Sequence, residues 1–379
     1  MFLQIHTLTS YHGSLLNRDD AGLAKRIPFG DATRLRISSQ CLKRHWREAL
    51  RQNLKLPSGI RSRHFFSREV LPRVIANGIN EENAHKLIRG MIEILIAGGL
   101  DDGDTLFLKQ PILFGKPEAD FLVALVSECT KQDNPEKALE DRLKSDKKNF
   151  RAMLSQAGHG DLFAGFEGAL FGRFVTSDIL ARSDASVHVA HALTVHALDT
   201  EVDYFTVVDD LLLEEETGAA HAGDMELGAG LFYGYVAVDT PLLVSNLTGC
   251  NYKDWKKQQF DDARDVLRAL IRAIATVSPG AKLGSTAPHA YSEFVLLESG
   301  TQQPRSLANA FLAALQPKGD LMQTSVDALA NHVLALDSMY GKTADTRVAS
   351  STHSVPPDCC RTMPLEKSID QAIEALVAG

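Results

Sequence analysis

The sequence predicts an α+β protein, because a few strand-like segments are separated by long helical ones. Residues 2–10 alternate loosely and include β-branched side chains, which predicts an N-terminal strand. A basic loop and an amphipathic helix follow this strand, and most of the C-terminal third has helical periodicity. This order of elements fits neither an all-β protein nor a helix bundle.

Length and composition narrow the class of protein. The 379 residues suggest two or three domains, or one large domain with insertions. Hydrophobic residues at 44% and charged residues at 23% exclude collagen-like, coiled-coil and disordered chains. Residues 1–10 lack the features of a signal peptide, and the 5 scattered cysteines favour neither a disulfide framework nor a cysteine zinc site. We therefore expect a cytoplasmic protein.

Charge is distributed unevenly along the chain. The formal net charge is -8, yet residues 1–75 contain 14 lysines and arginines against 5 aspartates and glutamates. A basic block on an acidic protein favours a local surface for a polyanion. The alternative is a solvated face that acidic neighbours balance in the folded protein.

The basic block consists of a loop and a helix. Residues 17–20 predict a turn, and a loop rich in lysine and arginine follows over 25–36. Ser38 and Ser39 are typical capping residues and predict a helix over 40–51. At 100° per residue, one face of this helix is apolar (Leu42, Trp46, Ala49, Leu50) and the opposite face is mostly cationic (Gln40, Lys43, Arg44, Arg47, Arg51).

The remaining elements follow from periodicity and from glycine and proline breaks. Residues 64–155 predict an inserted helical subdomain, whose basic cluster is interleaved with acidic residues and favours a salt-bridged surface. A projecting hairpin or loop is expected over 199–224. Strands are expected at 169–177, 187–195, 227–238 and 291–297, and helices at 261–277, 306–315, 325–339 and 365–377.

The sequence lacks the motifs that mark several common classes of enzyme. The chain has no phosphate-binding G-x-x-x-x-G-K-[ST] loop and no G-x-S-x-G elbow. The histidines His188, His191, His196 and His221 are expected to be structural rather than metal ligands. Asp19, Asp20 and Asp31 could hold Mg²⁺ beside a bound RNA, but turn formation is the simpler explanation.

Single-stranded nucleic acid is the ligand that the strongest constellation favours. The cationic helix face and the basic loop would follow the phosphates, and the pairs Arg173-Phe174 and Tyr204-Phe205 would supply side chains that stack on bases or wedge between them. Phosphate contacts of this kind carry no sequence information.

The motifs also resemble a known family. Residues 16–20 (LNRDD), 28–30 (PFG), 36–44 (RISSQCLKR), 172–177 (GRFVTS), 190–196 (AHALTVH), 203–210 (DYFTVVDD) and 279–282 (PGAK) are similar in order and spacing to the CasC family. CasC proteins, of the RAMP superfamily, form the backbone of the type I-E CRISPR Cascade complex. The likeness extends over essentially the full length.

The resemblance implies a hand-like fold and a ribonucleoprotein function in antiviral defence. An RRM-like (ferredoxin-like) palm would comprise 1–56, 186–198 and 229–379, helical fingers 57–185, and a thumb hairpin 199–228. Several copies would stack head to tail as a helical oligomer along the CRISPR RNA, and each thumb would displace a base. The partners implied are CRISPR RNA, target DNA, further copies of the chain and other Cascade subunits, with no cofactor and no metal.

The family's contacts can be carried over residue by residue. Those to RNA map to Arg18, Lys25, Ser38, Gln40, Lys43, Arg44, Arg47, Arg173, Phe174, Ser177, Tyr204, Phe205 and Val208. Contacts to target DNA map to Lys137, Lys144, Lys147 and Lys148.

The resemblance implies a subunit that is not an enzyme, but one departure keeps an alternative open. Asp31 stands where the family is expected to have glycine, and related subunits of type III complexes cut target RNA with an aspartate in a comparable loop. The alternative is therefore a metal-dependent ribonuclease that cuts complementary RNA with Asp31.

Overall fold

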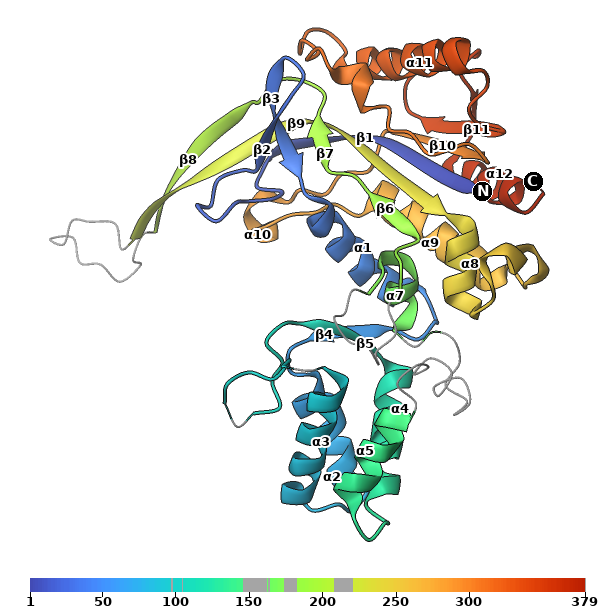
Figure 1. Cartoon of the computed structure of the whole chain (residues 1–379). Coiled ribbons are helices and arrows are strands. Elements are labelled where there is room, and N and C mark those ends of the chain that lie inside the picture. Colours follow the sequence, from blue (N-terminus) through green and yellow to red (C-terminus); the bar gives the residue numbers. More distant parts are fainter. Residues whose placement is uncertain are drawn as a thin grey trace, which may run out of the picture. The chain divides into compact units, whose positions relative to one another are not determined.

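The computed structural model describes residues 1–96, 98–103, 105–145, 162, 164–173, 183–207 and 221–378. These residues form two compact units (Figure 1). The first comprises residues 1–53, 188–238 and 264–379, and the second comprises 54–187 and 239–263. No helix among the described residues is long and apolar enough to cross a membrane.

A mixed sheet forms the centre of the first unit, which confirms the α+β prediction. The strand order is β12-β11-β10-β1-β9-β7-β3-β2, and β6 and β8 also pair with β9. Strand β10 is antiparallel to β1 and β11, whereas β11 and β12 are parallel. The strands are β1 (Phe2–Ser14), β2 (Arg26–Phe29), β3 (Ala32–Ile37), β6 (Val187–Val189), β7 (Ala192–Thr194), β8 (Thr200–Val207), β9 (His221–Asp239), β10 (Phe294–Gly300), β11 (Thr346–Ser351) and β12 (Arg361–Thr362).

Both faces of this sheet are covered, so β1 is buried on both sides along most of its length. On one face Leu8 and Phe294 pack with Val326 and Leu329 of α11. On the other face the Ser299 hydroxyl donates to the Ala372 carbonyl of α12 at 2.9 Å. The helices are α1 (Ser39–Asn53), α9 (Asp261–Thr276), α10 (Leu283–Thr286), α11 (Leu321–Tyr340) and α12 (Leu365–Ala378), with a 3-10 turn η3 (Ala308–Phe311).

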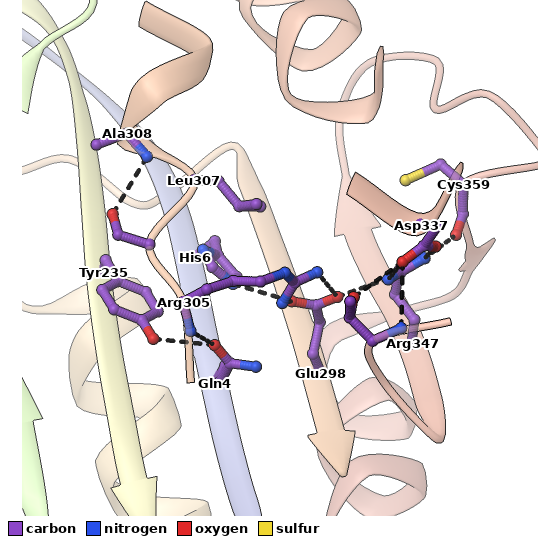
Figure 2. Close-up of polar contacts among 12 residues, drawn as sticks. Gln4, His6, Tyr235, Glu298, Arg305, Leu307, Ala308, Asp337, Arg347 and Cys359 are labelled. Carbon is purple, nitrogen blue, oxygen red and sulfur yellow. Dashed lines mark hydrogen bonds and ion pairs between the residues drawn. The ribbon is translucent and has the colours of Figure 1, made fainter. Parts of the chain in front are cut away.

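A buried ionic network lies on the α11 face of the sheet (Figure 2). The fully buried Glu298 carboxylate accepts from Arg305 Nη1 at 2.8 Å and from Arg347 Nε at 2.7 Å, and Arg347 also donates to Asp337. His6 Nε2 lies 3.2 Å from the same carboxylate. Burial alone would raise the pKa of Glu298, but hydrogen bonds from His6 and Arg305 hold it well below its usual range.

The second unit contains the predicted helical subdomain together with elements that sequence patterns did not indicate. Its core includes the stacked rings of Phe65 and Phe114, packed with Ile88 and Met91 of α3 and Leu122 of α4. The elements are β4 (Gly59–Ser62), a π-helical turn η1 (Phe66–Val70), α2 (Leu71–Ala76), α3 (Glu81–Leu95), β5 (Ile112–Gly115), α4 (Lys116–Cys129), α5 (Pro135–Ser145), α7 (Gly165–Phe171), α8 (Thr240–Thr248) and a 3-10 turn η2 (Tyr252–Lys257).

Three sequence predictions of local structure were wrong. The strand expected at 169–177 begins as helix α7, since a short apolar run fits a buried helix as well as a strand. The helix expected at 306–315 is only the short turn η3. Backbone groups of this segment form hydrogen bonds to the sheet instead: Leu307 N donates to Tyr233 Oη, and Leu315 N donates to Val195 O. The basic loop over 25–36 is the hairpin of β2 and β3.

Candidate nucleic-acid interface

Helix α1 has the two faces that its sequence predicts. Leu42, Trp46 and Leu50 are buried, and the first two line a small cavity together with sheet residues such as Ile5 and Phe232. Gln40 and Arg44 are exposed, and Lys43 and Arg47 are half-buried on the same outer side as these two. Arg44 Nε makes an exposed ion pair with Glu48 at 3.3 Å, which contributes little to stability. The helix therefore presents several cations along one surface.

Side-chain caps fix the start of α1. Ser38 Oγ accepts a hydrogen bond from Cys41 N at 3.3 Å, as expected for an N-cap residue. Ser38 N in turn donates to Asn17 Oδ1 at 2.9 Å, so the loop after β1 is tied to the helix. Ser38 is therefore buried and occupied as a cap, whereas Gln40 in the first turn of α1 is exposed.

The segment that carries Lys25 is held beside the same helix. Lys25 N donates to Asn17 O at 2.9 Å, and Arg36 N donates to Lys25 O at 2.8 Å. Glu226 of β9 accepts from Ala24 N at 2.7 Å and from Arg26 Nη2. Ala24 and Arg26 both form hydrogen bonds with Glu226. These bonds hold the backbone on either side of Lys25 in place. Arg18 is exposed and forms a backbone bridge to Ala24 in this loop.

Cations of the basic segment and of α1 influence the pKa values of two neighbouring groups, Cys41 and His191. Burial raises the pKa of the Cys41 thiol, while nearby Arg44 and Lys25 oppose the shift. Burial also lowers the pKa of His191, and Arg36 and Lys25 lower it further. Lys25, Arg36 and Arg44 thus lie near the first turn of α1.

The predicted projecting hairpin is formed by β8 and β9 (Figure 1). Its register pairs Tyr204 with Asp224 and Phe205 with Gly223, so the two aromatic side chains lie on opposite faces. Tyr204 is 68% exposed. Phe205 is half-buried, and Lys282 Nζ lies 5.1 Å from the centre of its ring, which is a cation–π contact.

The remaining predicted contacts include residues of the second unit. Arg173 belongs to the second unit and is buried, where its Nη1 donates to Glu118 Oε1 at 2.7 Å and to Leu113 O at 3.1 Å. We leave Arg173 out of the proposed RNA surface because its charge is already neutralised in the core. Lys137 and Lys144 lie on α5, and Lys144 pairs with Glu140. Phe174, Ser177, Val208, Lys147 and Lys148 lie outside the described residues.

Asp19 and Asp31 of the basic segment are engaged in local structure. Asp19 Oδ1 accepts from Ala21 N and Leu23 N, both at 3.0 Å, as expected for a turn. Asp31 Oδ1 accepts from Ala314 N at 2.8 Å and lies 3.5 Å from Arg34 Nη2. In the part of the chain that the structure describes, no group of three or more His, Cys, Asp or Glu side chains could hold a metal ion.

The family is decided by a sequence match over almost the whole chain. A family model described as CT1975-like protein matches residues 3–377. The chain belongs to the CT1975-like protein family. No curated protein matches this CT1975-like chain.

Two solved structures share the fold of this CT1975-like chain. A chain of a "CRISPR RNA-guided surveillance complex, pre-nicking" is 24% identical, with a TM-score of 0.80, and the match covers 99% of this chain and 100% of that one. A chain of a "CRISPR RNA-guided surveillance complex" is 20% identical, with a TM-score of 0.61, and the match covers 99% of both chains.

Several residues of the candidate interface in this CT1975-like chain could not be found from the sequence. The sequence predicts a turn at Asn17 and a basic loop at Arg36, and neither residue is among the predicted RNA contacts. The sequence predicts that His191 and His196 are structural. The Nε2 atom of His196 accepts a hydrogen bond from Leu231 N, as a structural histidine would, whereas His191 is exposed beside α1. Glu226 had no signal at all, because its partners are 200 residues away in sequence and meet it only through the sheet.

Proposed function

We propose that the chain is a non-catalytic, guide-RNA-binding backbone subunit of a CRISPR RNA-guided surveillance complex of type I-E. The observation that carries this proposal is the cationic outer face of α1, tied through Asn17 to the segment of Lys25. The fold shared with chains of such complexes supports it. The protein holds the RNA by its phosphates, and base pairing with the target reads the sequence.

The two units then have separate roles. The sheet of the first unit is the palm, the hairpin of β8 and β9 is the thumb, and the helices of the second unit are the fingers. Tyr204 is the thumb side chain that meets a displaced base, since Phe205 lies on the other face. Copies stack head to tail along the RNA, and Lys137 and Lys144 of the fingers contact target DNA.

Charge removal on α1 tests the proposal. In the doubly substituted Lys43→Gln, Arg47→Gln protein, RNA affinity should fall, and log K against log salt should become less steep by about 0.7 for each phosphate that the protein no longer neutralises. Arg272→Gln on α9, whose guanidinium pairs with Glu366 of α12, is the matched control and should leave the slope unchanged. An unaltered slope in the double variant would remove α1 as the phosphate track.

A ribonuclease that uses Asp31 is the second candidate, and we do not adopt it. The Asp31 carboxylate accepts a hydrogen bond from Ala314 N and forms an ion pair with Arg34, and these contacts favour a structural role. Cutting of complementary RNA that requires both Mg²⁺ and Asp31 would restore this candidate.

A further inference from the structure

His191 lies beside the start of α1 because of the strand register. In the pairing of β3 with β7, Ile37 is opposite Ala192 and Arg36 is opposite Leu193. His191 precedes this pair, so it stands next to Ser38 and Ser39 at the point where β3 ends and α1 begins. Its side chain is exposed.

The hydrogen bonds of His191 settle which ring nitrogen carries the proton. Nδ1 accepts from Ser39 N at 3.3 Å and lies 3.2 Å from Arg36 Nη1, which is always a donor. Two donors at Nδ1 require an unprotonated Nδ1 and therefore place the hydrogen of a neutral imidazole on Nε2. The lowered pKa of His191 agrees with a neutral ring at physiological pH.

This arrangement leaves the N–H group at Nε2 of His191 on the side of the ring away from Ser39 and Arg36. Within the described residues, no group accepts a hydrogen bond from Nε2 of His191. The ring is also fixed by its Nδ1 contacts, so a ligand that meets Nε2 need not order a mobile side chain. The Arg36 guanidinium beside it supplies positive charge, and Lys25 is near enough to lower the same pKa.

We propose that His191 is a further RNA-binding residue, which donates a hydrogen bond from Nε2 to a phosphate oxygen that Arg36 attracts. The inference deepens the proposed function and rests on it. A phosphate oxygen is the ligand that fits, because it accepts hydrogen bonds only and favours neighbouring cations. A neutral donor releases no counterion, so His191 should add affinity without adding to the salt dependence, in contrast to Arg36.

Two substitutions separate this role from a purely structural one. In His191→Gln the side-chain amide can occupy the position of Nε2 and donate outward, but the inner acceptor is removed. In His191→Asn the side-chain oxygen can replace Nδ1 toward Ser39, but the outward donor is removed. A direct contact predicts that Asn weakens RNA binding about tenfold while Gln stays within about threefold of wild type.

The experiment measures affinity for one labelled single-stranded RNA across a salt series, near neutral pH. His191→Asn should lower the affinity at every salt concentration with an unchanged slope, whereas Arg36→Gln should flatten the slope by about 0.7. Wild-type affinity in His191→Asn would overturn the proposal. So would the reverse order, with Gln weaker than Asn, because it would make His191 only an acceptor that orients Arg36.

The Lys43→Gln, Arg47→Gln protein, measured with the same RNA, distinguishes the two levels of failure. If it loses affinity while both His191 variants bind normally, the RNA face stands and only the role of His191 fails. If it also binds normally, the proposed function of this face fails. Urea unfolding of each variant checks that weakened binding does not reflect a failure to fold.

Discussion

Glu226 in β9 and Arg26 in β2 form a bidentate contact, in which Arg26 Nη2 lies 2.6 and 2.7 Å from the two carboxylate oxygens. The carboxylate is only 7% exposed and also accepts from Ala24 N, so three hydrogen bonds end on one buried group. Because Glu226 belongs to the hairpin strand and Arg26 borders Lys25, this pair connects the proposed thumb to the proposed phosphate-binding segment.

Glu226→Gln should therefore reduce both stability and RNA binding. The amide oxygen can still accept from Ala24 N, but the ion pair with Arg26 is lost and the amide NH2 cannot accept from Arg26 Nη2, which should lower the free energy of unfolding by about 1–2 kcal/mol. RNA affinity should fall about threefold or more because Lys25 is less well positioned. Urea unfolding and RNA titration check the two effects. The exposed pair of Asp254 and Lys257 is the control, and Asp254→Asn should change neither quantity.

Opposite faces of the hairpin predict different consequences for its two aromatic residues. Tyr204 is 68% exposed, so Tyr204→Ala should change stability by less than about 0.5 kcal/mol while it impairs assembly on RNA. Phe205 covers Gly223 and contacts Lys282, so Phe205→Ala should destabilise the hairpin itself. Stability is measured by urea unfolding, and assembly by the mass of the complex with RNA. Normal assembly of Tyr204→Ala would count against a base-wedging role.

The two faces of α1 could be predicted because they depend on local periodicity, and a projecting hairpin or loop over 199–224 could be predicted because its acidic residues do not suit a buried core. Leu42, Trp46 and Leu50 recur at helical spacing, and no distant residue is needed to infer which side is buried. The position of His191 could not be predicted, because it follows from the register of β3 against β7 across about 155 residues. The burial of Arg173 could not be predicted for the same reason: an arginine beside a phenylalanine gives no sign of the buried Glu118 that neutralises it.

Gly30 is required at the tip of the β2–β3 hairpin. Its φ is 63°, and a Cβ at this position would overlap the Leu312 carbonyl, to which Asp31 N donates. Gly30→Ala should therefore lower the free energy of unfolding by more than about 2 kcal/mol, from the combined cost of the left-handed backbone and the overlap. The same substitution at Gly22 measures the cost of the left-handed backbone alone.

At Gly22, φ is 87° but no atom lies within 4 Å of the added Cβ. Gly22→Ala should consequently cost only about 1–2 kcal/mol, which is the backbone penalty alone. Urea unfolding of the two variants measures the difference. Equal losses would show that the hairpin tip moves away from residues 312–314 without a penalty.

The buried ionic network predicts how stability depends on pH. Burial lowers the pKa of His6 below its ordinary value of 6.5, although its contact with Glu298 opposes the shift. Below about pH 6.5 the unfolded chain binds a proton at His6 that the folded protein does not, so the unfolded state binds more protons. The free energy of unfolding should therefore fall as the pH is lowered from about 6.5 toward the folded pKa, by at most about 1.4 kcal/mol per pH unit for this one group.

His6→Gln isolates this contribution from those of other histidines, such as His332, whose pKa burial also lowers. At about pH 7.5 the variant should be less stable than wild type, because the ring nitrogens of His6 lie 2.9 Å from Tyr233 Oη and 3.2 Å from Glu298 Oε2. Between about pH 6.5 and 5.5 its stability should fall less steeply than that of wild type, since Gln does not titrate. Parallel urea midpoints for the two proteins over this interval would mean that His6 titrates with an unshifted pKa in the fold.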